Sequence, residues 1–205
     1  QIKSTPPNNS YPIYVAYKDA SYNGSVTVLK TTSIGGQWVT VGESGFTGKS
    51  VDHLSLAVDS TGTPYVAFES SNQLLAVRKW DGNNWINVGN PYLTTKITTW
   101  ISIVVNPITD EPYVAYQESN KIKVKKFNGV DWVAVGSDLA NISNNYGAYT
   151  SLIMRQTDIS DYEPAIAYQA SPPNASASSL SVYYYIPPAS VSTLISKYKN
   201  WQPNK

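Results

Sequence analysis

The sequence predicts an all-β fold made of four consecutive copies of one unit. A motif of proline followed by a short run of aliphatic and aromatic residues that ends in Tyr or Phe occurs four times, beginning at Pro12, Pro64, Pro112 and Pro164. A second motif, Trp-x-x-Val-Gly, follows three of the copies and begins at Trp38, Trp85 and Trp132. A period of about fifty residues containing several strand-like runs is the signature of propeller blades. We therefore expect a β-propeller of four blades, each with four antiparallel strands.

The repeat continues without a linker, so the 205 residues are predicted to form a single domain. The expected units span residues 12–53, 54–100, 101–150 and 151–198, with terminal tails at 1–11 and 199–205. The first unit starts at its second strand, because nothing before Pro12 corresponds to residues 54–58. We expect a terminal strand, from residues 190–198 or from residues 2–4, to complete this unit and close the ring, since closure removes exposed sheet edges.

Each unit should contain four strands of about five residues. In the second unit these are residues 54–58, 64–68, 74–80 and 85–88, and in the third unit residues 101–105, 112–116, 122–127 and 132–135. Asp81-Gly82 and Asn128-Gly129 precede the last strand of each unit, where a tight hairpin requires positive φ. Helices are not expected, because no segment keeps an apolar period of about 3.6 residues.

The composition limits the kinds of partner. The net charge is +1 and only 14% of the residues are charged, so no nucleic-acid partner is expected, since phosphate binding needs clustered Lys and Arg. The lysines of residues 121–126 alternate in part with apolar residues, as on the solvent side of an edge strand. Cysteine is absent, which excludes disulfides and thiolate metal ligands. We expect no cofactor, no metal and no membrane-spanning segment.

An extracellular or cell-surface location is expected. The chain is rich in Ser, Thr, Asn and Tyr, and it starts at Gln1 instead of Met, as a processed chain does. In that compartment Asn-x-Ser sequons can carry glycans. The candidate glycosylation sites are Asn8, Asn23, Asn141 and Asn174, although this number is about what chance would give.

Residues 62–68, together with Trp85-x-x-Val88-Gly89, resemble a known repeat. The repeat belongs to bacterial and archaeal extracellular β-propeller proteins, in which Gly-x-Pro-Tyr-Val-Ala-Tyr and Asn/Asp-Gly-x-x-Trp-x-x-Val-Gly mark successive blades. The resemblance covers residues 12–168 and implies architecture but no activity, because such repeats occur in large surface proteins of mostly unassigned role. The last unit departs from the pattern, since Pro187-Pro188 follows its third strand and no Trp motif appears.

Catalysis is not expected. His53 is the single histidine and lies beside Asp52, but the chain offers no Cys and no Ser in a nucleophile-elbow context, so it is interpreted as a solvated loop residue. A glycoside hydrolase would need paired carboxylates, and the candidates are Asp19, Glu69 and Glu118. These three occupy equivalent positions after the second strands. Residues repeated by blade symmetry usually serve every blade alike, whereas an active site is asymmetric.

The same positions can be interpreted as a binding surface, although ordinary polar loops with tyrosines covering the blade tops are the favoured interpretation. The loops after the second strands should share one rim with the loops that enter the inner strands, and aromatic and polar groups there could bind sugars. The predicted ligand-binding residues are Asp19, Tyr22, Phe46, Glu69, Tyr92, Glu118, Tyr146, Tyr149 and Gln169. The tryptophans of the second motif are expected to pack between neighbouring blades, each removing a large apolar area from water.

The sequence therefore predicts a non-catalytic extracellular β-propeller that acts as a structural or interaction module, such as a protomer of a cell-surface assembly. Its partners would be copies of itself or other surface proteins, reached through the terminal tails, because free termini ordinarily fray unless something holds them. The alternative is a lectin with sugar sites on or between blades, whose partners would be glycans. A glycoside hydrolase ranks last.

Overall fold

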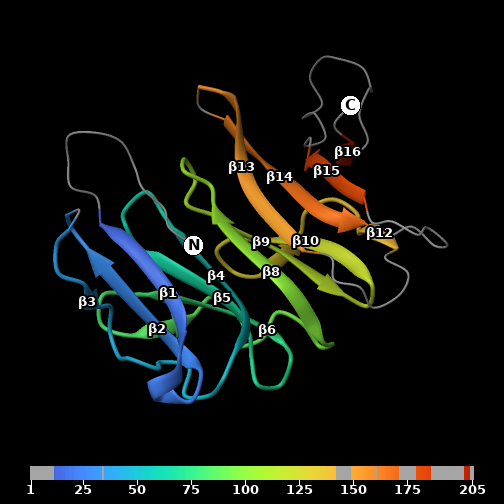
Figure 1. Cartoon of the computed structure of the whole chain (residues 1–205). Helices are drawn as coiled ribbons and strands as arrows, with labels where there is room; N and C mark the ends of the chain where they lie inside the picture. Colours follow the sequence, from blue (N-terminus) through green and yellow to red (C-terminus); the bar gives the residue numbers. More distant parts are fainter. Residues whose placement is uncertain are drawn as a thin grey trace.

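The computed structural model of the chain consists of four antiparallel β-sheets that follow one another around an arc (Figure 1). It describes residues 12–33, 35–141, 149–159, 161–170, 179–185 and 201–203. The predicted all-β class is confirmed, because these residues contain a single short 3-10 helix, Ala20–Tyr22, beside the strands. No helix in this part of the chain is long and apolar enough to cross a membrane.

Consecutive strands build each sheet. The first sheet holds β1 (Ile13–Asp19), β2 (Ser25–Thr31) and β3 (Val39–Thr40). The second holds β4 (Asp52–Val58), β5 (Pro64–Glu69), β6 (Leu75–Trp80) and β7 (Trp85–Asn87). The third holds β8 (Thr98–Val105), β9 (Pro112–Glu118), β10 (Lys121–Phe127) and β11 (Trp132–Ala134), with β12 (Leu139–Asn141) also paired to β10. The fourth holds β13 (Thr150–Asp158), β14 (Asp161–Ala170), β15 (Ser179–Tyr185) and β16 (Trp201–Pro203).

The second and third sheets have the strands that the repeat predicts. The proline motifs form the second strands β5 and β9, and the turns before β7 and β11 contain Gly82 at φ 104° and Gly129 at φ 96°. L-residues other than Gly rarely adopt such values, which explains the Asp-Gly and Asn-Gly pairs. In the first sheet β1 carries the proline motif, so its three described strands correspond to the second, third and fourth strands of the other sheets.

Strand β16 begins with a tryptophan at the position that the motif tryptophan occupies in the second and third sheets. In the second and third sheets Trp85 pairs with Trp80 and Trp132 pairs with Phe127. Trp201 pairs with Tyr185 in the same register. The outermost strand of the fourth sheet therefore exists but follows residues 186–200, and it lies where the sequence predicts a tail. Residues 2–4 and 190–198, proposed above to close the ring, lie outside the described residues, so ring closure stays a prediction.

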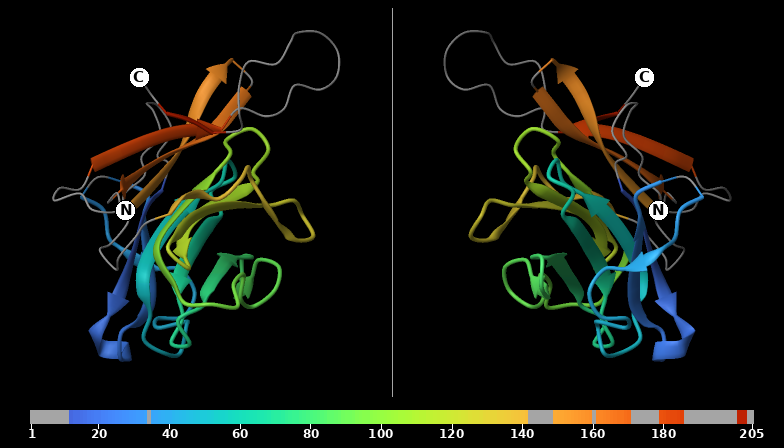
Figure 2. Two further views of the ribbon diagram at one scale, coloured as in Figure 1. Left: turned by 90° about the vertical axis from the view of Figure 1, so that its right-hand side faces the viewer. Right: turned by 90° about the vertical axis from the view of Figure 1, so that its left-hand side faces the viewer.

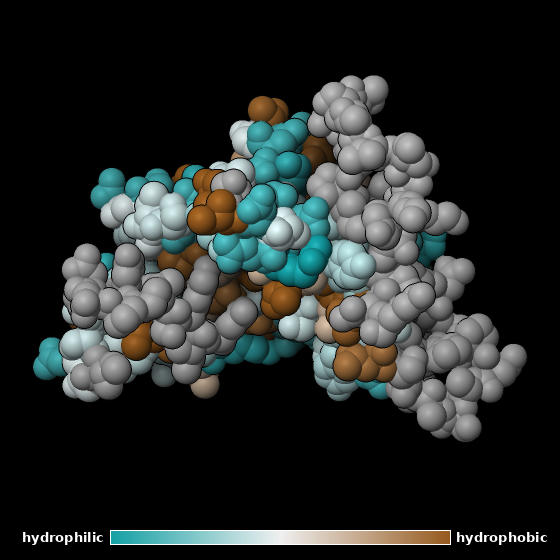
Figure 3. All heavy atoms as spheres, turned by 90° about the horizontal axis from the view of Figure 1, so that it is seen from above, coloured by the Kyte–Doolittle hydropathy of each residue, from teal (hydrophilic) through white to brown (hydrophobic). Residues whose placement is uncertain are grey.

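Hydrophobic side chains fill the spaces between successive sheets. Trp85 Nε1 donates to the carbonyl oxygen of Val41 (2.9 Å), and Trp132 Nε1 donates to that of Val88 (2.7 Å), so these two tryptophans join neighbouring blades as predicted. Trp38 departs from the prediction, because it is 46% exposed and no described sheet precedes its own. Seen from above, hydrophobic side chains on the outside are scattered among hydrophilic ones (Figure 3).

The inner strands β4, β8 and β13 lie next to one another in turn, with β1, the second strand of the first blade, beside β4, and the sheets fan out from them (Figures 1 and 2). Serine hydroxyls tie three of these strands together. The backbone N–H of Ile103 donates to Ser55 Oγ (3.1 Å), and that of Leu152 donates to Ser102 Oγ (3.0 Å). Because the two serines hold equivalent positions, successive blades are joined in one fixed register.

Candidate functional site

The predicted rim is present in the structure. The start of each inner strand pairs with the end of the second strand of its own sheet, as in the pairs Asp52–Glu69, Thr98–Glu118 and Thr150–Tyr168. The loops that enter the inner strands and the loops that follow the second strands therefore meet at one end of the blades. This rim carries two groupings of side chains, a pocket between the first two sheets and a row of aromatic rings near the inner strands.

Asp19 has a structural role. Its carboxylate accepts hydrogen bonds from Thr27 Oγ1 (2.7 Å), Ser21 N (3.0 Å) and Tyr17 OH (3.3 Å). The bond from Thr27, followed by that from the Ser21 backbone, lowers the pKa of Asp19 below its ordinary value, and burial opposes them. The side chain caps the 3-10 helix after β1. Its acceptor capacity is thus used by its own blade.

Glu69 and Glu118 are also buried, at 7% and 9% exposure, and they have different partners. Glu118 forms an ion pair with Lys123 (2.5 Å) on β10. The Glu69 carboxyl lies beside the His53 ring, with Nε2 3.6 Å from Oε2. Burial is the main reason why the pKa of Glu69 is raised, and the charge of Asp52 adds to it. These carboxylates are held inside the rim and do not face each other across an open cleft.

A pocket of about 280 Å³ lies between the first two sheets. Its floor is formed by strands of the second sheet, and its wall by the loop that connects β3 to β4. The lining consists of Thr47, Gly48, Lys49, Ser50, Val51, Phe68, Ser70, Ser71, Ala76, Arg78, Asn87, Pro91 and Tyr92. Polar groups therefore surround a small space that also contains aromatic side chains.

Two cationic side chains, Lys49 and Arg78, line this pocket. Arg78 is fixed by two hydrogen bonds. Its Nη1 donates to the carbonyl oxygen of Phe46 (2.9 Å) and its Nε to Asn87 Oδ1 (3.3 Å). The guanidinium lies 5.9 Å from the Phe46 ring centre and 6.0 Å from that of Phe68. Burial lowers the pKa of Arg78 below its ordinary value, although the group keeps its charge, and nearby Tyr92 opposes the shift. These bonds use only part of its N–H donors, and the planar group is held in one orientation.

Hydrogen bonds fix the wall of the pocket. The backbone N–H of Phe46 donates to Val26 O (3.0 Å), and that of Gly48 donates to Gly45 O (2.9 Å). Gly45 and Gly48 have φ of 66° and 70°, which favours glycine at both positions. A Cβ on Gly45 would lie 2.6 Å from Tyr22 Cβ, so this turn also needs the small residue. The pocket is thus formed in advance of any ligand.

The predicted residues Phe46 and Tyr92 belong to this region. The Phe46 ring stacks on Trp85 at 4.3 Å with an interplanar angle of 10°, so it supports the site from behind. Tyr92 lines the pocket, is 43% exposed, and accepts a hydrogen bond from Asn72 (3.4 Å). Sequence reasoning missed Arg78. The sequence did offer a signal. Arg78 lies in the strand-like run between the proline motif and the tryptophan motif of its unit, and the third unit has Lys125 at the equivalent position.

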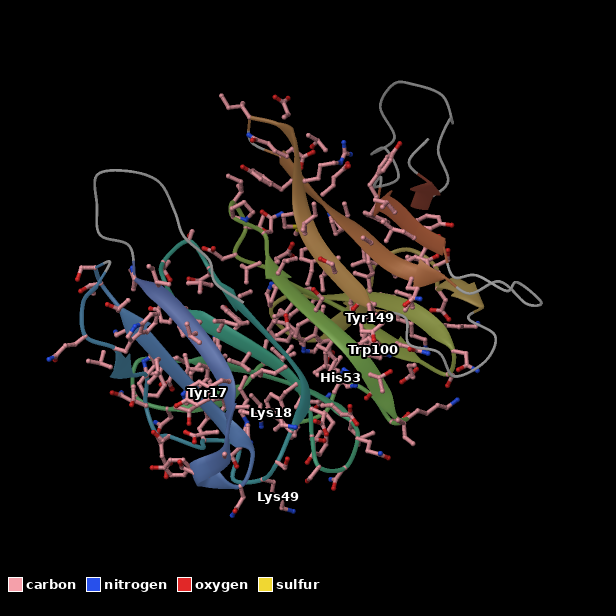
Figure 4. The ribbon with its side chains drawn as sticks, viewed as in Figure 1. Tyr17, Lys18, Lys49, His53, Trp100 and Tyr149 are labelled. Carbon is pink, nitrogen blue, oxygen red and sulfur yellow. The ribbon has the colours of Figure 1, made fainter. Side chains whose placement is uncertain are left out.

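A row of three rings runs across the inner strands, which we call the ring ladder: His53, Trp100 and Tyr149 (Figure 4). The His53 and Trp100 ring centres are 4.7 Å apart with the rings tilted by 60°, and those of Trp100 and Tyr149 are 4.1 Å apart with a tilt of 54°. Tyr149 is 62% exposed. Each ring stands two residues before a serine at an equivalent inner-strand position, Ser55, Ser102 or Ser151.

The backbone is unusual at two of the rings. His53 and Trp100 have φ of 46° and 52°, in the left-handed region. The pairing register shifts at both places, between Asp52 and Ser55 and between Thr99 and Ser102. These irregularities are β-bulges, which redirect side chains. His53 is therefore part of a strand and packs on Trp100, which corrects its interpretation as a solvated loop residue, and sequence reasoning missed Trp100 entirely.

The remaining predicted residues contribute less. Tyr22 is 49% exposed and covers Gly45, and the backbone N–H of Gln169 donates to Tyr149 O (3.3 Å). Tyr146 lies outside the described residues. Of the sequon asparagines, Asn23 is exposed in a turn at φ 55°, Asn141 ends β12, and Asn8 and Asn174 are outside the described part. The described residues contain no group of His, Asp and Glu arranged to hold a metal.

A second cavity of about 520 Å³ lies at the opposite rim, between the second and third sheets. Its acidic groups are engaged with neighbouring side chains, and the Lys79 ammonium lies over the Tyr65 ring, 5.9 Å from its centre. Asp110 accepts hydrogen bonds from the backbone and hydroxyl of Ser60 (both 2.8 Å), and Glu111 forms an ion pair with Lys126 (3.0 Å). The Arg78 pocket, where a cation keeps unused donors, is the stronger candidate for a ligand site.

Comparison with solved structures shows the fold. The chain is similar to a fungal lectin from Aleuria aurantia, described as a six-bladed β-propeller with a novel fucose recognition mode, at 17% identity and a TM-score of 0.56 over 94% of this chain and 58% of the lectin. The N224Q mutant of that lectin, solved with α-methyl-L-fucoside and with Fucα1-6GlcNAc, matches at 13% identity and a TM-score of 0.59 over 95% of this chain and 56% of the lectin.

The chain thus spans less than two thirds of the lectin, and its four sheets match part of a β-propeller. At these identities the likeness concerns the fold alone. No family model matches the sequence. Sequence comparison with curated proteins finds no match either. The predicted all-β arrangement of four antiparallel sheets is confirmed and matches part of a β-propeller, whereas a closed ring of four blades and membership of the bacterial and archaeal surface-protein family are not shown.

Proposed function

We propose that the protein is a non-catalytic carbohydrate-binding β-propeller whose Arg78 pocket holds one sugar residue. The observation that carries this proposal is the fixed, half-buried guanidinium of Arg78 in a small polar pocket between two blades. The alternative of a lectin is thereby preferred over the structural module. The similarity to lectins solved with fucose-containing ligands supports this choice at the level of fold.

The pocket matches the chemistry of a sugar. Its volume is slightly below the range of about 300–1,000 Å³ that is usual for drug-sized ligands, which suits a single pyranose. Arg78 can donate to two neighbouring sugar oxygens through its planar fork, while Asn87 and Ser70 can donate or accept. The Tyr92 ring offers an apolar face to the C–H groups of the sugar. Donors and acceptors are both present, as hydroxyl groups require.

Calorimetric titration with simple glycosides tests this site. The ligands are α-methyl-L-fucoside and the methyl glycosides of galactose, mannose, glucose and N-acetylglucosamine. We expect one of them to bind, and Arg78→Met to abolish that binding, because it removes the donors and keeps the apolar stem. The matched control is Lys79→Met, which removes a neighbouring charge outside the pocket lining and should bind as the wild type does. Equal binding by Arg78→Met would overturn the site, and silence of the whole panel would overturn the function.

A structural or interaction role is the second candidate, and one observation favours it. Trp38 is 46% exposed although its equivalents Trp85 and Trp132 are packed against a preceding blade. A partner blade could cover the same face of the first sheet. Sedimentation of the wild type and of Trp38→Ala tests this idea: a concentration-dependent assembly that the substitution dissolves supports it, and a monomer in both cases rejects it. The tail at residues 1–11, expected to mediate assembly, lies outside the described residues.

We further propose an extracellular or cell-surface location, on the grounds of composition and of the sugar-binding role. Asn23 would be the most accessible glycosylation site, because it is exposed in the turn after the 3-10 helix. Antibody labelling of intact cells, compared with permeabilised ones, distinguishes a surface protein from an internal one. Labelling only after permeabilisation would reject the location.

A further inference from the structure

The ring ladder has the features of a ligand surface separate from the Arg78 pocket. It places one ring from each of three successive blades in contact with the next, so that the rings form a continuous strip. The three rings occupy equivalent positions on the inner strands, near the axis around which the sheets are arranged. Figure 4 shows them in a row, with Lys49 of the Arg78 pocket apart from them.

We propose that the ring ladder is a second carbohydrate site, which binds an internal stretch of a neutral polysaccharide chain lying across the second, third and fourth blades. This site goes beyond the proposed function of the pocket, which takes one sugar residue. A sugar presents an apolar face of C–H groups that packs on aromatic rings, and its hydroxyls bond to polar groups beside them. Consecutive sugars can use consecutive rings.

Backbone conformation supports a functional reason for the rings. A bulky residue in the left-handed region, as at Trp100 with φ 52°, is a genuine outlier and is strained. The same conformation recurs at His53 in the neighbouring blade. The hydroxyl of Thr150 donates to the Trp100 carbonyl oxygen and holds this strained turn in place. Strain of this kind persists where a structure needs the side chain in one direction.

The charges beside the ladder favour a neutral ligand. Lys18 is paired with Asp52 (2.5 Å), and the Glu69 carboxyl lies against the His53 ring (3.6 Å). No surplus of positive charge remains among these four groups to attract a phosphate chain. Polar atoms that can bond hydroxyls are nevertheless close, since Gln117 pairs with Thr99 immediately before Trp100 and Tyr149 carries its own hydroxyl.

The strip also favours a chain over a single sugar. Tyr149 is 62% exposed, Trp100 and His53 are partly exposed, and each ring contacts the next, so the strip offers several adjacent ring surfaces instead of one enclosed space. Binding strength on such a surface should grow with the number of sugars that reach a ring. A short oligonucleotide could also stack on aromatic rings, but it would need a cationic groove beside them.

Titration with oligosaccharides of increasing length tests the proposal. The probes are oligomers of one to six units of β-1,4-linked glucose, xylose, mannose and N-acetylglucosamine. Calorimetry measures the binding of each oligomer. We expect one series to bind with an affinity that rises by at least about tenfold from one unit to six, since each ring contact adds a modest energy. An excess of the glycoside that fills the Arg78 pocket should not displace the hexamer. Equal affinity at all lengths, displacement by the glycoside, or no binding by any series overturns the proposal.

Two substitutions test whether the hexasaccharide binds at the ring ladder. Trp100→Gly removes the middle ring and suits the positive φ, so it should fold, and Tyr149→Ala removes an exposed ring with little effect on packing. Each should weaken hexamer binding by about tenfold or more. Trp38→Ala, which removes an exposed tryptophan from the outer part of the first sheet, should leave it unchanged. Unchanged affinity in Trp100→Gly and Tyr149→Ala, or tighter binding of a thymidine hexanucleotide than of any hexasaccharide, overturns the assignment.

Discussion

The interface between the first and second sheets and the interface between the second and third share two kinds of bond. In each, a tryptophan indole and a cationic side chain donate to backbone carbonyls of the preceding blade. The bonds are Trp85 to Val41 and Arg78 to Phe46 in the first interface, and Trp132 to Val88 and Lys125 to Leu93 in the second. These shared contacts explain why the repeat is so regular in sequence.

The two interfaces differ in the residues around these bonds. Arg78 holds its acceptor at 2.9 Å and lies over an aromatic ring, whereas Lys125 reaches the Leu93 carbonyl oxygen at 3.4 Å beside an aliphatic side chain. Asn87, which bonds to Arg78, is replaced by Ala134 at the equivalent strand position. The difference teaches that repeated residues hold the blades together, while the residues that vary between blades create a site.

The largest expected effect concerns the shared contacts. Trp85→Ala and Trp132→Ala should each lower the free energy of unfolding by about 3 kcal/mol, because each removes a large packed ring and a partly buried hydrogen bond. Trp38→Ala should cost less than about 1 kcal/mol, since its side chain has no preceding blade among the described residues. Urea unfolding measures all three. A cost for Trp38→Ala as large as that for Trp85→Ala would break the comparison and indicate a blade packed on the first sheet.

A smaller effect is expected from exchanging the two cations. Arg78→Lys should weaken glycoside binding by roughly tenfold, because lysine cannot offer two donors in one plane. The reverse exchange, Lys125→Arg, should not create a second glycoside site, since Leu93 and Ala134 cannot orient the guanidinium as Phe46 and Asn87 do. Calorimetric stoichiometry distinguishes one site from two. A second site in Lys125→Arg would show that the cation alone decides binding.

The smallest effect is a pH dependence of the free energy of unfolding. It arises in the second unit, where His53 occupies the position that Trp100 has in the third unit. Burial lowers the pKa of His53 below 6.5, with Asp52 opposing the shift and Lys18 adding to it. The unfolded chain therefore takes up the proton first, and stability should fall as the pH drops through about 6.5. Burial raises the pKa of Glu69 above 4.5, so the folded chain binds this proton more tightly than the unfolded chain does. Protonation of Glu69 should therefore add stability as the pH falls toward 4.5.

Unfolding curves at several pH values check this dependence. His53→Asn should be less sensitive to pH between about 7.5 and 5.5, and asparagine tolerates the positive φ at this position. Glu69→Gln should keep the loss of stability near pH 6 and lack the gain at lower pH. Identical pH profiles for wild type and His53→Asn would remove His53 as the cause.

Much of the architecture could be predicted because the repeat combines apolar runs with turn residues. The proline motif marks the second strand of each sheet, and Gly82 and Gly129 mark hairpins that require positive φ. The same method missed β16, since Trp201 follows its hairpin partner Tyr185 only after residues 186–200. A motif search assumes a fixed spacing, and a long connection hides an element whose pairing is otherwise regular.

The candidate site was only partly predictable. Tyr92, Phe46 and Tyr149 were identified because aromatic residues in rim loops are chemically conspicuous. Trp100 was missed because an inner strand that begins with Thr-Thr-Trp looks regular, and only the bulge redirects its ring. Asp19, Glu69 and Glu118 were predicted to bind a ligand because their equivalent positions suggested a common use. In the structure each is buried and has a partner within its own blade.

The position of β16 has a consequence for the order in which the sheets assemble. In the second and third sheets the outermost strand is joined to its partner through four residues, 81–84 or 128–131, but in the fourth sheet through fifteen, 186–200. Closing the longer connection costs about 1 kcal/mol more in chain entropy. It also requires residues 201–203 to be synthesised, whereas the earlier hairpins are complete sooner after their own strands. The fourth sheet should therefore be the last to gain protection from hydrogen exchange during refolding, and its edge the first to lose it.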